Sequence, residues 1–132
     1  MENKDIRWKQ RFQNFGKAKA LLENALEKKQ PDIIYRAGII QIFEMTFELA
    51  WKTLKDYLQE QGFIEIKTPK DSIKKAFEIG LLEDGHKWMK ALEDRNLTAH
   101  TYDEATAIEV EQLIRNIYYP LLNQLYNKLI EK

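Results

Sequence analysis

Apolar residues recur every three or four positions along most of the chain, which is the spacing of one face of an α-helix. The first helical segment is expected from about Lys4 to Lys29, and the Gln30–Pro31–Asp32 sequence ends it. A second segment runs from about Asp32 to Gln61, where Gly62 stops it. Apolar residues cover most of this second segment. Its polar positions form one stripe, comprising Gln41, Glu44, Glu48, Lys52, Lys55 and Gln59. A helix with so wide an apolar surface belongs at the centre of a bundle or in an oligomer interface.

Two shorter helices are expected in the middle of the chain. Phe63–Ile66 alternates like a strand, but four residues without a partner strand make a connector. Thr68–Asp71 then has the form of a helix start, with a threonine cap, a proline in the first turn and an aspartate near the positive end. This helix ends at Gly80, a left-handed cap, and the next helix follows Asp84–Gly85.

The last long helix is predicted to begin near Tyr102, because Thr101–Glu104 has the Thr-x-x-Glu form of a capping box. Pro120 lies inside it and should kink it by removing one hydrogen bond. The expected buried face comprises Ala107, Val110, Ile114, Ile117, Leu121 and Leu125. The pattern therefore predicts an all-α, up-and-down bundle of about five helices, with residues 1–132 in a single domain.

Composition narrows the class of function. Hydrophobic residues make up 44% and charged residues 32%, as in an ordinary folded domain, and 21 basic residues balance 21 acidic ones. Nucleic-acid binding would therefore need a local patch. The absence of cysteine excludes disulfides, thiolate metal sites and cysteine nucleophiles. No charged-then-apolar leader and no apolar run of about 18 residues is present, so we expect a cytoplasmic protein without a membrane partner.

The candidate chemistry lies in Arg95-Asn96-Leu97-Thr98-Ala99-His100, with Tyr102 two positions later. On a continuous α-helix the side chains of Arg95 and His100 would diverge by roughly 140°. They can share a site only if the helix ends between them, and the capping box predicts such an end around Thr98–Ala99. The start of the last helix would then offer unpaired N–H groups to an anion.

Arginine and histidine beside a phosphate can cleave RNA without a metal. Arginine holds the phosphate by its planar fork of donors, and histidine exchanges protons near neutral pH. The alternative interpretation is structural: Arg95 pairs with Glu44 or Glu48, and His100 caps a backbone group. For an arbitrary Arg-x4-His spacing this alternative carries the greater weight, because the spacing alone is common.

Other charged residues have two interpretations each. A basic region precedes the motif and could guide RNA, although interleaved acidic residues favour a solvated face; it comprises Lys67, Lys70, Lys74, Lys75, Lys87 and Lys90. Glu44 and Glu48 could form an acid/base pair but are better explained as solvent-facing. The same two glutamates could be read as a metal pair, and the solvent-facing explanation is again preferred. His86 has no second histidine or carboxylate at metal-ligand spacing on its helix, so no metal and no cofactor is expected. The three tryptophans are expected in the core or a dimer interface.

Several short motifs resemble one known family. Gly80-Leu81-Leu82, the Asp84–Gly85 turn, Trp88 and above all Arg95–Tyr102 are similar to the HEPN superfamily, in its branch of nucleotidyltransferase substrate-binding proteins. The resemblance is strongest from Thr68 to Glu104, and the flanking helices extend it over essentially the whole chain. The Arg-x4-His-x-Tyr string in this context is much more specific than the spacing alone.

The resemblance implies a homodimer in which two Arg-x4-His segments face one cleft. It implies a toxin that is a metal-independent endoribonuclease acting on RNA such as tRNA or mRNA. Arg95 would hold the phosphate, His100 would be the acid/base and Asn96 would assist. The partner would be a minimal nucleotidyltransferase antitoxin that adenylylates Tyr102. All four positions are intact in this chain.

Two further interpretations remain. The chain could be a non-catalytic substrate-binding subunit of a two-component nucleotidyltransferase. It lacks the Gly-Ser loop and spaced aspartates that nucleotidyl transfer requires, so it could not perform that reaction alone. It could also be a helical adapter, although an adapter has no need for an arginine and a histidine beside a helix start.

Overall fold

Two long helices form the base of the fold. In a computed structural model, which describes the backbone of residues 2–132 and the side chains of residues 7–132, α1 spans Glu2–Ala25 and α2 spans Ile33–Glu60. Asp32 starts α2, because its carboxylate accepts a hydrogen bond from the Tyr35 amide at 2.8 Å. Gly62 follows the helix with a φ of +102°, a left-handed conformation that glycine adopts without strain. Both boundaries confirm the sequence prediction.

The middle helices are α3 (Pro69–Glu78) and α4 (Gly85–Asp94). The predicted cap of α3 is present as a full capping box: Thr68 Oγ1 accepts from the Asp71 amide, and the Asp71 carboxylate accepts from the Thr68 amide. Residues 63–66 form a connector without strand structure, as predicted. Gly80 reverses the chain after α3 with a φ of +85°, and the following Leu81 is buried.

The last helical rod differs from its prediction at two points. It begins at Glu104, not near Tyr102, because Asp103 and not Thr101 caps it. The rod consists of α5 (Glu104–Leu113), the π turn η2 (Ile114–Tyr118) and α6 (Tyr119–Ile130). Pro120, which has no N–H to donate, therefore lies in the first turn of a new helix segment, where it is tolerated. The prediction located the break in the helix correctly but did not predict a π turn.

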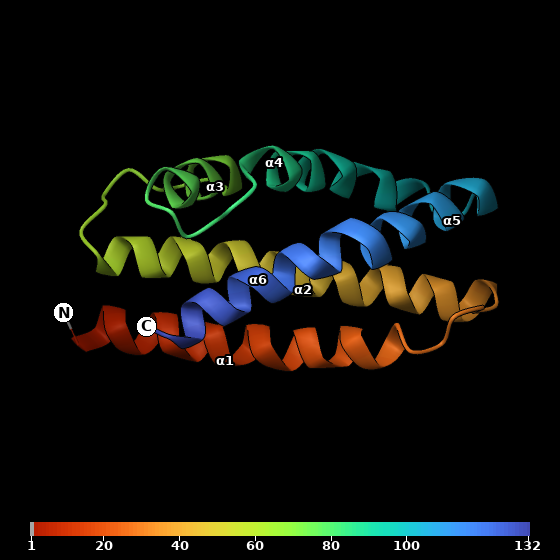
Figure 1. Cartoon of the computed structure of the whole chain (residues 1–132), viewed down its shortest axis with the longest axis horizontal. Coiled ribbons are helices and arrows are strands. Elements are labelled where there is room, and N and C mark those ends of the chain that lie inside the picture. Colours follow the sequence, from red (N-terminus) through yellow and green to blue (C-terminus); the bar gives the residue numbers. More distant parts are fainter. Residues whose placement is uncertain (1) are drawn as a thin grey trace.

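The helices pack as an all-α, up-and-down bundle, as predicted (Figure 1). Helices α1 and α2 run antiparallel, α3 and α4 lie along the other side of α2, and the α5–α6 rod crosses back over them. Helix α2 is central, as its wide apolar surface predicted: twelve of its residues are buried. Trp8, Trp51 and Trp88 all lie in the core. None of the helices in the described residues is long and apolar enough to cross a membrane.

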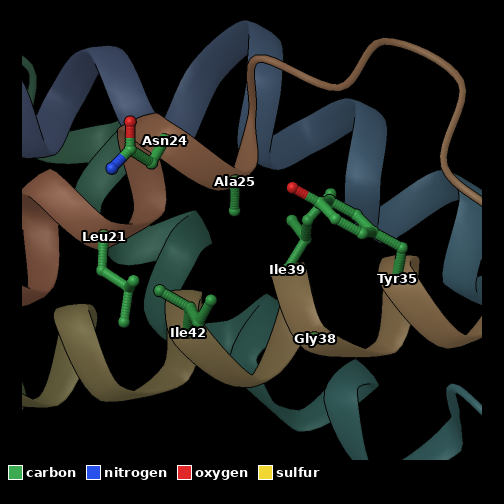
Figure 2. Close-up of a pocket in the computed structure, with 7 residues that line it drawn as sticks. All are labelled: Leu21, Asn24, Ala25, Tyr35, Gly38, Ile39 and Ile42. Atoms are coloured by element: carbon green, nitrogen blue, oxygen red, sulfur yellow. The ribbon is translucent and has the colours of Figure 1, made fainter.

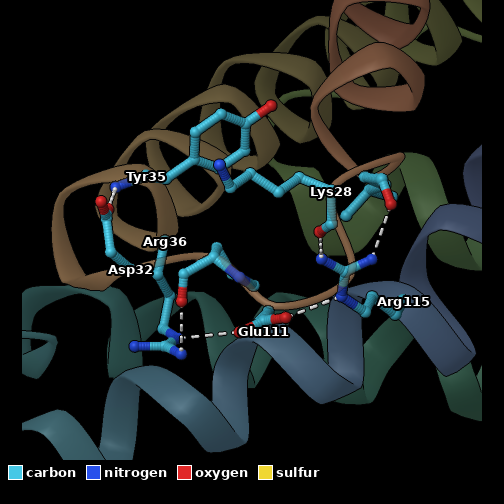
Figure 3. A network of polar contacts seen from close by, with 8 residues as sticks. Lys28, Asp32, Tyr35, Arg36, Glu111 and Arg115 are labelled. Carbon is cyan, nitrogen blue, oxygen red and sulfur yellow. Dashed lines mark hydrogen bonds and ion pairs between the residues drawn. The ribbon is translucent and has the colours of Figure 1, made fainter.

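A buried ionic network joins the first loop to the last rod (Figure 3). Glu111 on α5 is 2% exposed and accepts hydrogen bonds from Arg36 Nε at 2.8 Å and from Arg115 Nε at 2.7 Å. The two guanidinium groups also donate to backbone carbonyls of the α1–α2 connection, those of Leu26, Lys28 and Pro31. This network fixes the α1–α2 connection against α5.

Candidate active site

The Arg95–His100 segment is a 3₁₀ helix, η1, that directly continues α4. The expected end of an α-helix around Thr98–Ala99 is therefore wrong: α4 ends at Asp94. Threonine hydroxyls support the tighter helix, since Thr98 Oγ1 donates to the Arg95 carbonyl at 2.6 Å and Thr101 Oγ1 donates to the Thr98 carbonyl at 3.1 Å. Thr101 thus closes η1, which explains why it does not cap α5.

A 3₁₀ helix has about three residues per turn, so every third side chain shares a face. Arg95 and Thr98 lie on one face and line the same groove. His100 lies five residues from Arg95, which corresponds to a divergence of about 120° and an axial separation of about 10 Å. Within the described residues no hydrogen bond or ion pair joins Arg95 to His100. The helical segment alone does not bring the two groups together.

Arg95 lies in a groove between η1 and α2. Its Nη1 is 3.2 Å from Glu48 Oε2, and its guanidinium lies 6.0 Å from the centre of the Phe47 ring. The groove encloses about 500 Å³ and is lined by Gln41, Glu44, Met45, Glu48, Arg95 and Thr98. The ion pair with Glu48, one of the two structural alternatives for Arg95, is therefore present. Arg95 nevertheless stays one-third exposed at the groove, so an anion that displaces Glu48, or that binds Arg95 together with Glu48, has access to its guanidinium.

Glu48 is held as a carboxylate. Burial acts to raise its pKa, but the hydrogen bond from Trp51 Nε1 and the contact with Lys52 outweigh burial, and the net pKa lies below the ordinary value. Glu48 remains half exposed, in agreement with its place in the polar stripe. The groove therefore contains a permanent negative charge next to Arg95.

His100, Asn96 and Tyr102 all face solvent. The His100 ring makes no hydrogen bond or ion pair with the described residues, so the predicted alternative of a capping histidine is not observed. The rings of His100 and Tyr102 lie edge to face with centroids 6.1 Å apart. Tyr102 is 83% exposed, which leaves its hydroxyl accessible to another protein.

The start of α5 is not an open anion site. The Asp103 carboxylate accepts hydrogen bonds from the Thr106 hydroxyl at 2.8 Å and the Thr106 amide at 3.1 Å. These two bonds lower the pKa of Asp103, so the cap is ionised at neutral pH. The Asp103 carboxylate caps the Thr106 amide and places a negative charge at the helix start, which opposes the phosphate binding that the sequence predicted there.

Sequence reasoning missed one group that supports the motif. Tyr118, in the π turn, is 2% exposed, stacks on Phe43 and donates its hydroxyl to the Asp94 carboxylate. Asp94 is the last residue of α4, immediately before Arg95. The Asp94–Tyr118 bond therefore fixes the point from which η1 begins. The nearest indication in the sequence was Pro120, because a proline inside a helical pattern marks a change in the helix, and here that change is the π turn that contains Tyr118.

A second, apolar groove lies between α1 and α2 (Figure 2). It encloses about 280 Å³ and is lined by Leu21, Asn24, Ala25, Tyr35, Gly38, Ile39 and Ile42. Exposed apolar residues continue from it along α2, since Ile34 is 78% and Met45 40% exposed.

Within residues 7–132, no three His, Asp or Glu side chains gather closely enough to hold a metal ion.

Known proteins resemble the chain over most of its length. A Thermus thermophilus protein of known crystal structure is 36% identical, with a TM-score of 0.81, and the match covers 87% of this chain and 98% of that one. A Haemophilus influenzae protein, described as revealing the fold of a substrate binding domain of a nucleotidyltransferase, is 28% identical with a TM-score of 0.80 over 90% of this chain and 98% of that one.

A curated relative from Haemophilus influenzae (strain ATCC 51907 / DSM 11121 / KW20 / Rd), named probable ribonuclease HepT, is 38% identical over 88 residues. The match covers 61% of this chain and 60% of the relative, so the two are matched over less than two thirds of either length. The family model described as "Nucleotidyltransferase substrate binding protein like" matches residues 10–131. These matches confirm the family resemblance noted in the sequence. The chain belongs to the nucleotidyltransferase substrate-binding protein family, which has a HEPN-like fold.

Proposed function

We propose that this protein is a metal-independent endoribonuclease of the HEPN toxin type, controlled by a minimal nucleotidyltransferase that adenylylates Tyr102. The observation that carries the proposal is the exposure of the motif: Arg95 lines an open groove, and His100 is exposed to solvent five residues farther along the same 3₁₀ helix. A relative named as a ribonuclease supports the same activity.

The proposed reaction is an internal transesterification. His100 accepts the proton of the ribose 2′-OH, whose oxygen attacks the adjacent phosphorus. The bond from phosphorus to the 5′-oxygen breaks, that oxygen takes up a proton, and a 2′,3′-cyclic phosphate remains. Arg95 stabilises the charge on the phosphate oxygens through its guanidinium donors. Asn96, exposed beside Arg95, is assigned a supporting polar contact with the same phosphate.

A homodimer suits this chemistry better than a lone chain. Within one protomer, Arg95 and His100 diverge by about 120° and are separated by about 10 Å along η1. Two facing η1 segments would place the arginine of one protomer near the histidine of the other. The apolar surface of α2 supports such an association, because Met45 lines the Arg95 groove and Ile34 lies exposed farther along the same helix.

Control at Tyr102 follows from its exposure and its position. A nucleotidyltransferase would join AMP from ATP to the Tyr102 oxygen and release pyrophosphate. The ring of Tyr102 already lies 6.1 Å from that of His100, so a covalent adenylate there would compete with RNA for the same surface. Inhibition by occupancy needs no conformational change. An adenylate that points away from His100 in a structure of the modified protein would contradict it.

The alternative function is a non-catalytic subunit that binds substrate for a separate nucleotidyltransferase. The description of the structurally similar Haemophilus influenzae protein favours it, and so does the Glu48 carboxylate beside Arg95, which weakens the attraction for phosphate. Both functions predict a nucleotidyltransferase partner. They differ in whether the isolated chain cleaves RNA.

The deciding experiment is incubation of purified protein with total tRNA and a defined mRNA in EDTA, with the mass verified to show that Tyr102 is unmodified. We expect cleavage that leaves 2′,3′-cyclic phosphate ends. His100→Ala should abolish cleavage without lowering the melting temperature, because the side chain is exposed and unbonded. Gln124→Ala is the matched control, since it removes another exposed polar side chain, on α6, that belongs to neither the motif nor the Arg95 groove. Intact RNA with all three proteins would favour the binding-subunit function.

A further inference from the structure

An aromatic ring on α3 is fixed against a glycine on α4. A Cβ atom on Gly85 would lie 2.9, 3.0 and 3.3 Å from Cγ, Cδ1 and Cδ2 of Phe77, so the ring rests directly on the glycine backbone. Phe77 is nevertheless 49% exposed. The ring is thus supported on one side and open to solvent elsewhere.

Phe77 forms part of a small pocket between α3 and α4. The pocket encloses about 170 Å³ and is lined by Ile73, Lys74, Phe77, Gly85, His86 and Met89. Ligand sites for larger molecules enclose about 300–1,000 Å³, so this one has room for a single ring. Its walls are apolar apart from Lys74 and His86, whose exposed side chains offer hydrogen bonds at the rim. These properties suit one flat heteroaromatic ring.

Unpaired positive charges lead to this pocket. Lys70, Lys74 and Phe77 follow one another at intervals of four and three residues, so they share one face of α3, and Lys67 precedes that helix. All three lysines are exposed. Among the described residues none of them makes an ion pair, although Asp71 interacts electrostatically with Lys74. The patch therefore retains positive charge.

The other lysines of the basic region are neutralised. Lys75 pairs with Glu78 at 2.8 Å, Lys87 with Asp84 at 3.6 Å, and Lys90 with Asp94 at 3.3 Å. The interleaved acidic residues thus account for three of the six lysines, and those three form the solvated face that the sequence favoured. Of the remaining three, Lys74 lines the pocket of Phe77, Lys70 lies one turn earlier on the same face of α3, and Lys67 precedes the helix.

We propose that Phe77 and its pocket are a nucleobase subsite for single-stranded RNA, with one base stacked on Phe77 and the neighbouring phosphates held by Lys70 and Lys74. Stacking on an aromatic ring combined with a basic groove is how proteins bind single strands. Gly85 lies ten residues before Arg95, about 15 Å along α4. The inference rests on the proposed ribonuclease function for the identity of its ligand.

RNA fits these observations better than a protein segment does. A protein segment would gain from the apolar pocket but would not use three cations that lack ion pairs. An RNA strand uses both the ring and the charges, and the pocket is too small for a large apolar side chain cluster.

The test is fluorescence anisotropy with a labelled 12-nucleotide single-stranded RNA, on protein carrying His100→Ala so that the strand stays intact. Phe77→Ala should weaken binding by about 5- to 150-fold, the usual effect of losing one base–aromatic stack. Phe77→Trp should restore binding. Ile64→Ala is the matched control, because it removes an apolar side chain that is 84% exposed on the connector before α3. Lys70→Ala with Lys74→Ala should reduce the slope of log affinity against log salt by roughly 1.4.

Three outcomes would overturn the subsite. The first is equal RNA affinity of Phe77→Ala and the parent protein. The second is a loss of affinity on Phe77→Ala that is as large for an abasic strand, which has no base to stack, as for the normal strand. The third is that Phe77→Ala loses nucleotidyltransferase binding while its RNA affinity is unchanged. The binding assay does not depend on cleavage. If RNA binding depends on Phe77 but the wild type does not cleave RNA, the nuclease function is rejected and the subsite is kept. If the wild type cleaves RNA but binding does not depend on Phe77, the subsite is rejected and the nuclease function is kept.

Discussion

Replacing Glu111 by glutamine removes the one negative charge that two arginines share in the buried network. The glutamine side chain has the same shape, but its amide offers an acceptor to only one guanidinium and points a donor at the other. Arg36 and Arg115 are each only 13% exposed, so water replaces the lost bond poorly. The perturbation therefore leaves buried positive charge without its counter-charge.

The magnitude follows from that geometry. Breaking a buried ion pair by removing one partner costs about 3–5 kcal/mol. The arginines keep their bonds to the backbone carbonyls of the α1–α2 connection, which places the expected loss near the lower end, about 3 kcal/mol. A chain of 132 residues unfolds with an entropy of about 0.28 kcal/mol/K, from about 2.1 cal/mol/K per residue, so the melting temperature should fall by about 10 °C.

The assay is urea and thermal unfolding followed by circular dichroism, with wild type, Glu111→Gln and Glu109→Gln side by side. Glu109 lies on the same helix but is exposed and makes no ion pair with the described residues, so its replacement should change the free energy of unfolding by less than about 0.5 kcal/mol. A loss below about 1 kcal/mol for Glu111→Gln would refute the reasoning. It would mean that the network contributes little beyond the desolvation that it requires.

Three other predictions concern the same residue and the motif. Burial acts to raise the pKa of Glu111, but the bonds from Arg36 and Arg115 outweigh it and lower the pKa below 4.5, so the stabilising effect of the carboxylate is present above that pH and is lost as the pH falls through the folded-state pKa. The difference in stability between wild type and Glu111→Gln should therefore shrink below about pH 4.5. A constant difference from about pH 7 to about pH 3 would contradict this. Arg95→Lys should lower RNA cleavage by about 10-fold or more, since a lysine cannot reproduce the planar fork, and unchanged single-turnover rates would remove Arg95 from the phosphate. Tyr102→Phe should stay folded and active while gaining no AMP mass in the presence of nucleotidyltransferase and ATP; silencing of this variant by the partner would show that control is by protein binding alone.

The sequence predicted most of the fold because its signals were local. The caps at Asp32 and Thr68 and the left-handed glycine at Gly80 each depend on a few neighbouring residues, and each was observed. The wide apolar surface of α2 also predicted its central place, because only a central helix can bury most of its circumference.

The errors arose where two local signals competed. Thr101 could cap a helix or donate to a carbonyl in the preceding turn, and Asp103 could also cap; the pattern alone did not decide between them. For the same reason the sequence did not distinguish a 3₁₀ continuation of α4 from a helix end. The Glu111 network and the Asp94–Tyr118 bond join residues far apart in the chain, so no spacing rule could reveal them.

The π turn at Ile114–Tyr118 has a consequence for the comparison of relatives. A π turn accommodates one more residue than an α-helical turn while the helix continues on its path. A relative without that extra residue would keep the same rod, and its correct alignment to this chain would contain a one-residue gap inside a helix. Aligning such a relative without the gap would pair Tyr118 with the wrong position and would hide the partner of Asp94. Histories of insertion and deletion in this family can therefore be read at this turn, provided that gaps within helices are permitted.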